Sequence, residues 1–425
     1  MNIAKNWGVA VALAFVAGVC LAACGGTTSP EAAGTNDALS EGADFVPAPH
    51  PAVAQLVNRG GHVIASPKFV VVTFPSDVDA PKLEAFAAKL GASEYWRGIG
   101  SEYGVGPATS TAVHLAESAP AELDYVSASK PSDAPERQPG TVNEWLASRL
   151  DRADPALGVP DASTIYVVYF PATTSVTFSN GGGSKLCQGV GGFHDAVRIA
   201  DGRHIPFAVV GHCPAGLSRT PLDAATQLTS HELFEAVTNP EPFLAPGFLI
   251  DNDLEASQHV GGEIADLCQD EYAPTVPSDI GFSVEPMWSN EAARANGNPC
   301  IPGASDKPYF DSLAKLPETK TLTIFSGSPQ DVPVVTVPVG GSVTLEISLY
   351  SNRPTVEWNV EAIPDFFAKD EIALTLDRDH GKNGDVLHLT VKRLKEIGPS
   401  HDRSDFRIVS KLGDEQVVHL YTALP

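Results

Sequence analysis

Hydrophobic and polar residues follow two different patterns along this chain, and the change of pattern divides it. Lys68–Phe74 and Thr164–Phe170 are continuous β-branched and aromatic runs, which predict buried strands. Ala80–Leu90 has apolar residues three and four positions apart, which predicts a helix, and Thr141 begins a capping-box pattern that predicts another. From Leu322 the chain changes to short alternating strands. We therefore predict an α/β domain followed by an all-β domain.

Composition sets the remaining boundaries. Residues 25–50 are rich in Gly, Thr, Ser, Ala and Pro, a composition that cannot bury a core and predicts a flexible tether. The last part of the chain holds about seven predicted strands in about one hundred residues, which suggests an immunoglobulin-like β-sandwich with Trp358 on a middle strand. The predicted organisation is a signal peptide at 1–24, a tether at 25–50, an α/β domain at 51–305, a linker at 306–320 and a β-sandwich at 321–425.

The start of the chain has the pattern of an export signal. Lys5 supplies a positive charge, Val9–Leu21 form a short apolar run, and small residues lead up to Cys24. This order resembles a bacterial lipoprotein signal, which implies cleavage before Cys24 and acylation of its thiol, so the membrane is an expected partner. Gly25 instead of Asp after the cysteine favours the outer membrane or cell surface within the cell envelope. The alternative is a plain secretory peptide cut after Ala23.

The acidic balance of the chain excludes one class of partner. Its 425 residues carry a formal net charge of −24, and the sequence pI is near 4.8. Nucleic-acid binding needs a basic surface that releases counterions from phosphates, so nucleic acid is not expected as a partner. A hydrophobic content of 43% is that of a globular protein.

Four cysteines remain after the signal segment: Cys187, Cys213, Cys268 and Cys300. Four cysteines allow three pairings, and export to an oxidising compartment favours disulfides. We favour Cys187 with Cys213 and Cys268 with Cys300, because each pair brackets one local segment. The spacings include no C-x-x-C, so a zinc ribbon is not indicated.

The strongest candidate for chemistry is Thr229–Pro240, which reads T-S-H-E-L-F-E-A-V-T-N-P. His231 and Glu235 are four residues apart, so on a helix they lie on one face, about 6 Å apart at Cβ, where both can bind one metal ion. Glu232 takes the position of the general base in the H-E-x-x-H metallopeptidase pattern, whose second His is replaced here by Glu. The alternative is a surface pair of His231 and Glu235 joined by an ordinary hydrogen bond.

A second acidic motif follows at Gly262–Cys268, which reads G-E-I-A-D-L-C. Glu263 and Asp266 are three residues apart, so in a helical turn both carboxylates face the same way. Metallopeptidases of the gluzincin type take their third ligand from such a downstream Glu, and a further acid holds a ligand histidine in its tautomer. By that resemblance Glu263 is the predicted third ligand, and Asp266 is the rival ligand or an outer partner.

Together these motifs resemble a group of secreted bacterial proteins that share S-H-E-x-x-E-A-x-T-[DN]-P, then G-E-x-x-D-x-C, then W-S-N, here Trp288–Asn290. The chain is also distantly similar to the plant phosphate-induced, or Exordium-like, cell-wall proteins, whose G-Y-H element after a Cys is matched by Gly192–His194. The resemblance covers roughly residues 60 to 305 and implies a zincin-like domain with a mixed sheet and an active-site helix. It makes His194 a further candidate ligand or outer partner, with Asp195 available to orient its ring.

These observations predict a surface-anchored lipoprotein with a metal-dependent, peptidase-like hydrolase domain that acts on a peptide or cell-wall substrate. Zn²⁺ is the expected cofactor. Two carboxylates and one imidazole are a harder donor set than that of the usual zinc site, so Ca²⁺ or Mn²⁺ is an alternative. The alternative function is a non-catalytic binding protein of the cell envelope or extracellular matrix on the same scaffold.

Overall fold

The computed structural model of the chain describes residues 45–51, 53–126, 137–179, 184–214, 220–251, 262–269, 276–302, 307–323, 329–365, 368–398, 402–413 and 415–425. The predicted signal peptide with Cys24, and the predicted tether up to residue 44, lie outside these residues. The described chain is an α+β protein with more strands than helices. None of the helices in these ranges is both long enough and apolar enough to cross a membrane.

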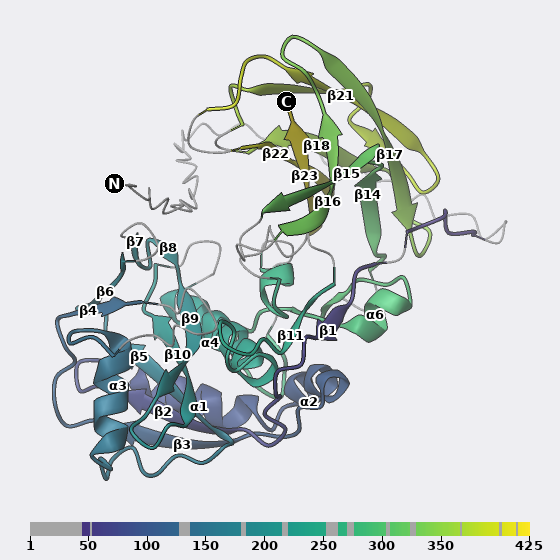
Figure 1. Ribbon diagram of the computed structural model, residues 1–425. Helices are drawn as coiled ribbons and strands as arrows, with labels where there is room; N and C mark the ends of the chain where they lie inside the picture. The colour runs from purple at the N-terminus through teal and green to yellow at the C-terminus, as the bar shows by residue number, and fades with distance from the viewer. Residues whose placement is uncertain are drawn as a thin grey trace, which may run out of the picture.

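The first domain is built on a five-stranded mixed sheet with strand order β3-β2-β5-β10-β9 (Figure 1). Its strands are β2 (Lys68–Thr73), β3 (Thr109–His114), β5 (Thr164–Phe170), β9 (Gly192–Arg198) and β10 (His204–Gly211). The first four strands in this order pair in parallel, and β9 runs antiparallel to β10 at the edge. The sheet therefore ends on one antiparallel edge strand, β9.

Both faces of this sheet are covered, because successive residues of its strands point to opposite sides. Val71 and Val167 face a core shared with helices α1 (Ala80–Leu90), α2 (Glu94–Gly100) and α4 (Pro221–Thr238). Val72 and Val168 face a second core shared with α3 (Val142–Asp151). The continuous apolar runs seen in the sequence are explained by this burial on both sides.

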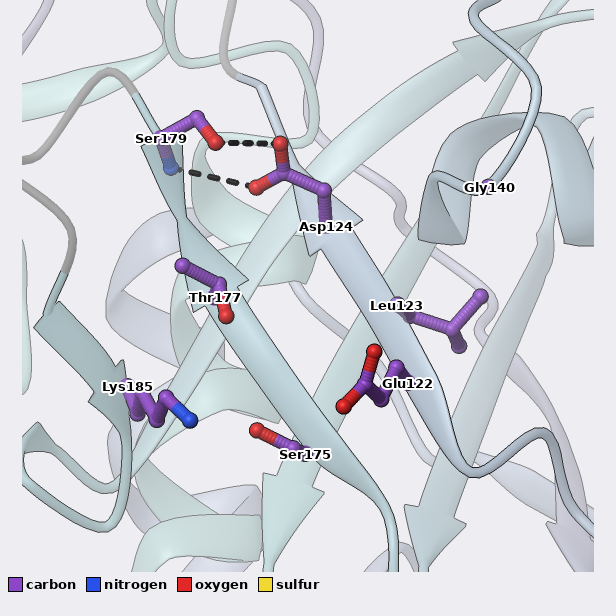
Figure 2. A pocket seen from close by; sticks show the side chains of 8 residues that line it. All are labelled: Glu122, Leu123, Asp124, Gly140, Ser175, Thr177, Ser179 and Lys185. Atoms are coloured by element: carbon purple, nitrogen blue, oxygen red, sulfur yellow. Dashed lines mark hydrogen bonds between the residues drawn. The ribbon is translucent and has the colours of Figure 1, made fainter.

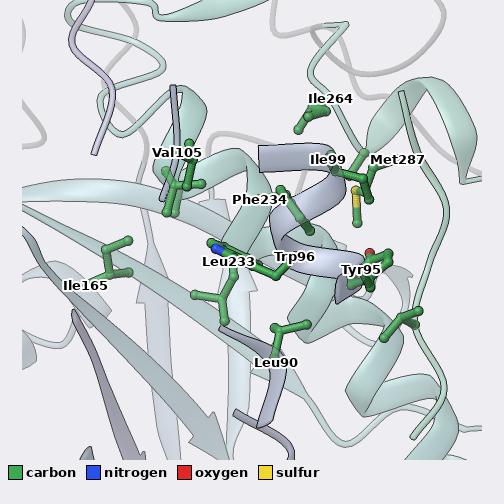
Figure 3. Close-up of a cluster of buried hydrophobic side chains, with 14 of the residues drawn as sticks. Leu90, Tyr95, Trp96, Ile99, Val105, Ile165, Leu233, Phe234, Ile264 and Met287 are labelled. Atoms are coloured by element: carbon green, nitrogen blue, oxygen red, sulfur yellow. The ribbon is translucent and has the colours of Figure 1, made fainter. Parts of the chain in front are cut away.

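Trp96 of α2 and Phe234 of α4 stack in the middle of the first core, with ring centroids 4.2 Å apart (Figure 3). Phe69 of β2 meets the Trp96 ring edge-on, with centroids 5.4 Å apart. All three side chains are fully buried. The aromatic residues near Glu94 thus pack the core, and they fix α4 against the sheet.

Short elements complete the first domain. A four-stranded sheet contains β4 (Glu122–Tyr125), β6 (Ser175–Phe178), β7 (Ser184–Leu186) and β8 (Gly189–Val190). Two ribbons pair β1 (Leu56–Asn58) with β11 (Phe248–Ile250), and β12 (Met287–Trp288) with β13 (Cys300–Ile301). The short helical segments are η1 (Ser101–Tyr103), η3 (Asp266–Cys268) and α6 (Asn290–Arg294).

Both predicted disulfides are present. Cys187 is bonded to Cys213, and Cys268 is bonded to Cys300. The second bridge ties η3 to β13. Disulfides of this kind suggest an extracellular or cell-envelope location.

The second domain is a sandwich of two sheets around one core (Figure 1). One sheet has the order β14-β17-β21-β19, and the other has the order β15-β16-β23-β22-β18-β20. Trp358 is buried between them and donates from its indole N–H to Ser312 Oγ over 3.0 Å. The strands are β14 (Phe310–Ala314), β15 (Glu318–Thr323), β16 (Pro329–Thr336), β17 (Ser342–Ser351), β18 (Trp358–Pro364), β19 (Ile372–Leu376), β20 (His380–Gly381), β21 (Val386–Arg393), β22 (Ser404–Leu412) and β23 (Glu415–Leu424).

Two segment boundaries differ from those predicted. The range 306–320 was predicted as a linker, but it holds β14 and the start of β15, whose few apolar residues hide their alternation. The last residues of the predicted tether are held against the sandwich. His50 Nε2 lies 3.2 Å from Asp311 Oδ2, and the Ala48 N–H donates to the Asn383 side chain over 2.9 Å.

Candidate functional site

Helix α4 carries the H-E-x-x-E motif, and the residues at its two ends determine where it begins and ends. Thr220 caps its start and accepts a hydrogen bond from the Asp223 N–H, and Pro221 occupies the first turn. At the other end the Asn239 N–H still donates to the Glu235 carbonyl, and Pro240 then prevents continuation. The second half of α4 is buried on all sides, and its buried residues include His231, Glu232 and Glu235. A surface pair of His231 and Glu235 is therefore not what the fold contains.

One group of donors forms around His231. Its Nε2 atom lies 3.2 Å from Glu235 Oε1 and 3.5 Å from Asp266 Oδ1. The other ring nitrogen, Nδ1, lies 3.2 Å from Glu285 Oε1. His231, Glu235 and Asp266 each offer one ligand atom, and these three atoms lie within 4.8 Å of one another. Such a group can hold a metal ion, with Glu285 orienting the imidazole from behind.

A second group forms around His194 on the edge strand β9. Its Nδ1 atom lies 3.4 Å from Glu235 Oε2 and 3.5 Å from Glu232 Oε2. Its Nε2 atom lies 3.2 Å from the Asn239 carbonyl oxygen and 3.4 Å from Glu263 Oε1. The ligand atoms of His194, Glu232 and Glu235 also lie within 4.8 Å of one another. Both groups therefore use the carboxylate of Glu235.

We call these six residues the histidine–carboxylate cluster: His194, His231, Glu232, Glu235, Glu263 and Asp266. Each of them has 8% or less of its surface exposed. Within the described residues, the ion pairs of its four carboxylates are with the two histidines alone. Burying several carboxylates without Lys or Arg partners is costly, and it is typical of sites that bind a cation.

Hydrogen bonds hold the segment that carries Glu263 and Asp266 against the C-terminal end of α4. The Asp266 N–H donates to Glu235 Oε1 over 3.2 Å, which ties η3 to α4. The Asn239 side-chain amide donates to Glu263 Oε1, and its oxygen accepts from the Gly247 N–H over 2.6 Å. Asn239 therefore both ends α4 and orients Glu263.

Glu285 is placed in a similar way. Its backbone N–H donates to Ser230 Oγ over 3.0 Å, and its carbonyl accepts from the Tyr95 hydroxyl over 2.6 Å. The segment that carries it is thus fixed to α4 one residue before His231. No motif in the sequence pointed to Glu285, because it lies outside both acidic motifs.

The cluster perturbs the ionisation of its members strongly. Burial opposes the charge of His231, but the negative charges of Glu235 and Glu285 prevail and hold its pKa well above the ordinary value. His194 has a raised pKa for the same reason, with Glu263 as the main negative charge. Burial also opposes ionisation of Glu235, but the charge of His231 and contacts with both rings lower its pKa to about 2.

Unlike that of Glu235, the pKa values of two other acids in the cluster are raised. Burial and the negative charge of Glu235 raise the pKa of Asp266 to about 8. Burial raises the pKa of Glu232 as well. Without a cation, the raised pKa values favour the protonated forms of both histidines and of Asp266.

The donor spacing fits a divalent cation. Two tetrahedral ligands at Zn–ligand bond lengths of about 2.0–2.1 Å lie about 3.4 Å apart. The distances from the inner ring nitrogens to Glu232, Glu235 and Asp266 range from 3.2 to 3.5 Å.

The predicted site residues are thus brought together, with different partners from those expected. His231 and Glu235 share one group as predicted, but its third member is Asp266, and Glu263 lies beside His194 instead. Asp195 does not orient the His194 ring, because neighbouring residues on β9 point to opposite faces. Its carboxylate accepts a hydrogen bond from the Tyr125 hydroxyl over 2.8 Å.

A cavity of ≈ 570 Å³ lies elsewhere in the first domain, over strands β4 and β6 (Figure 2). Its walls are mostly polar, and Asp124 is held there by hydrogen bonds from the backbone N–H and the hydroxyl of Ser179. None of its lining residues belongs to the histidine–carboxylate cluster: Glu122, Leu123, Asp124, Gly140, Ser175, Thr177, Ser179 and Lys185.

The class of protein defined by these features is an α+β protein that joins a buried histidine–carboxylate cluster to a two-sheet β-sandwich. No protein-family model and no curated protein matches the chain.

Similar solved structures include the titin M3 domain, with 13% identity over 28% of this chain and 94% of that one and a TM-score of 0.17. A FixG-related protein from Vibrio parahaemolyticus has 7% identity, coverage of 28% and 96%, and a TM-score of 0.18. Titin M4 has 13% identity, coverage of 26% and 92%, and a TM-score of 0.15. At these TM-scores the likenesses support no conclusion about the chain.

Proposed function

We propose that this protein is a metal-dependent hydrolase of the cell envelope, in which His231, Glu235 and Asp266 hold a divalent cation. The proposal depends on one observation above all. Two buried carboxylate oxygens, from Glu235 and Asp266, converge on Nε2 of the His231 ring, and a carboxylate oxygen of Glu285 lies 3.2 Å from Nδ1 on the other side. A carboxylate that orients a ligand histidine in this way is a regular feature of metal sites.

For the first domain we propose a zincin-like fold. A mixed sheet ends in the antiparallel strand β9, and the motif helix α4 packs beside that strand (Figure 1). For the second domain we propose an immunoglobulin-like sandwich that acts as a spacer or adhesion module, consistent with its two sheets and the buried Trp358.

The chemistry of the site divides between the cation and the chain. When bound, the cation supplies Lewis acidity that polarises a carbonyl and lowers the pKa of water. Glu285 holds the Nδ1 proton of His231, so that Nε2 faces the other donors. The backbone N–H of Asp266 fixes Glu235, and the burial of the cluster keeps bulk water away. Zn²⁺ suits this donor set, with Mn²⁺ or Ca²⁺ as alternatives.

We base the proposed location on the disulfides and on the first residues of the sequence. Both disulfides suggest export. We extend this to a lipid anchor on Cys24, which would attach the first domain to the envelope and place it near peptide or cell-wall substrates.

A second candidate is a non-catalytic envelope or matrix binding protein whose cation is structural. One observation favours it: the donors of the histidine–carboxylate cluster are buried, with 3% to 8% of each residue exposed. A catalytic cation needs an open position for substrate, whereas a structural one does not.

Metal analysis and a turnover assay on the full chain separate these functions. We expect the purified protein to retain Zn²⁺ and to cleave members of a peptide library or peptidoglycan fragments, measured by mass spectrometry. Asp266→Asn should weaken Zn²⁺ binding by about 10-fold or more, because one charged ligand is lost.

The matched control is Glu361→Gln, which removes a carboxylate from an exposed pair with Lys411 in the second domain. It should leave metal content and turnover unchanged. Retained Zn²⁺ with no turnover on any substrate would favour the structural cation. A folded protein that binds no cation would contradict both functions.

A further inference from the structure

Glu235 presents its two carboxylate oxygens to different histidines. Oε1 lies 3.2 Å from His231 Nε2, and Oε2 lies 3.4 Å from His194 Nδ1. The contacts of the two oxygens are therefore divided between two donor groups. A carboxylate that bridges two cations uses its oxygens in this way, at cation separations of about 3.5–4 Å.

We propose that the protein has a second cation site, formed by His194, Glu232 and Glu235, and that Glu235 bridges it to the first. This inference deepens the proposed function and rests on it for the first cation. The second group has the same composition as the first: one imidazole nitrogen, the shared carboxylate and one further carboxylate.

The outer side of the His194 ring supports this assignment. Nε2 faces the Asn239 carbonyl oxygen at 3.2 Å and Glu263 Oε1 at 3.4 Å, both of them acceptors. The proton of the neutral ring therefore belongs on Nε2, which leaves the lone pair of Nδ1 directed toward Glu232 and Glu235. Glu263 has the same role for His194 that Glu285 has for His231.

With both imidazoles neutral and all four carboxylates ionised, the charge of the cluster also favours more than one cation. Its four carboxylates are buried, and within the described chain they have no cationic partners except the two imidazoles. One divalent cation leaves about two negative charges uncompensated when the imidazoles are neutral, which is costly in a buried site. Two divalent cations balance the four carboxylates.

The second site assigns Glu232 a different role. Its carboxylate lies with His194, where this proposal makes it a ligand in place of the general base that the H-E-x-x-H comparison predicts. Sites with two cations occur in phosphatases, nucleases and aminopeptidases, where both cations clamp the oxygens of the reacting group. The substrate class expected here is accordingly a phosphate ester or a peptide with a free amino terminus.

The test is the stoichiometry and spectrum of Mn²⁺ bound to the full chain. We expect about two equivalents in wild type, with an exchange-coupled electron paramagnetic resonance signal from the bridged pair. His194→Gln and Glu232→Gln should each retain about one equivalent with an uncoupled signal, because the first group stays intact. Asp266→Asn should also lose about one equivalent, from the other site.

The stoichiometry distinguishes failure of the second site from failure of both sites. A wild type that saturates at about one equivalent, lost in Asp266→Asn and unchanged in His194→Gln, would overturn the second site and leave the proposed function standing. Binding of no cation would overturn both. Circular dichroism and thermal unfolding report the folding of each variant. The wild-type stoichiometry and spectrum decide the question even where a variant fails to fold.

Discussion

Gly192 on β9 lies directly against Glu232 on α4. A Cβ atom built on Gly192 would be 2.6 Å from Oε1 and 2.9 Å from Cγ of Glu232. The absence of a side chain at this point lets the carboxylate reach His194 between strand and helix. The glycine of the Gly192–His194 element is thereby explained by packing against the motif helix.

The first prediction concerns Gly192→Ala. The new methyl group meets the Glu232 side chain from Cγ to Oε1, so the fold should lose about 1 kcal/mol of stability. The Glu232 carboxylate has to move, so affinity for the second Mn²⁺ should fall about 10-fold to 100-fold. Titration followed by paramagnetic resonance measures this. The control is Gly98→Ala on the exposed side of α2, where nothing lies within 4 Å. Equal Mn²⁺ affinity in both variants would contradict the prediction.

Much of the local structure could be predicted from the sequence. The helix at Ala80–Leu90 and the strand at Thr164–Phe170 have the bounds that periodicity and β-branched content indicated. Strand β14, in contrast, was missed, because Phe310–Ala314 has too few residues to show a period and its register is set by pairing with β17.

The site was predictable only in part, for a physical reason. The i,i+4 relation places His231 and Glu235 together on any helix, so spacing alone was sufficient. Whether Glu263 or Asp266 joins them depends on how η3 is held against α4, and Glu285 reaches the site through a segment with no motif. Contacts between distant segments of this kind leave no periodic trace in one sequence.

The second prediction concerns the buried pair of Asp195 and Tyr125. Burial raises the pKa of Asp195 to about 6, which is above the value in the unfolded chain. The folded state therefore loses stability as the pH rises through this interval, by about 2 to 3 kcal/mol in full. Asp195→Asn cannot ionise, so its stability relative to wild type should rise by that amount between about pH 4 and pH 8. Denaturant unfolding at several pH values measures it.

The control for this prediction is Tyr125→Phe, which keeps the carboxyl group and removes the hydrogen bond that favours its ionised form. Its stability should fall with pH more steeply than that of wild type. A parallel pH dependence in wild type and Asp195→Asn would show that Asp195 ionises freely in the folded protein.

The third prediction concerns the Cys268–Cys300 disulfide. Replacing both cysteines by Ser opens a loop with a sequence separation of 32 and should cost about 3 to 4 kcal/mol of stability. The bridge also fixes η3, which begins at Asp266, so Zn²⁺ affinity should fall with it. The matched control is the double Ser variant of Cys187 and Cys213, with a separation of 26. That variant should lose similar stability and retain Zn²⁺ binding at His231, measured by calorimetry.

The fourth prediction concerns protons in the metal-free site. His194, His231 and Asp266 all have pKa values raised above those of the unfolded chain, to about 8 for Asp266. Groups with raised pKa values stabilise the folded state while they are protonated, and this contribution is lost as the pH rises through the folded values. The metal-free protein should therefore unfold at lower temperature at about pH 9 than at about pH 6.

Cations replace these protons, so Zn²⁺ binding near pH 7 should release about two to three of them. The loaded protein should then lose the pH dependence of its stability. Calorimetry in buffers of different ionisation enthalpy counts the protons. Binding without proton release would show that the imidazoles are neutral and Asp266 is ionised before the cation arrives.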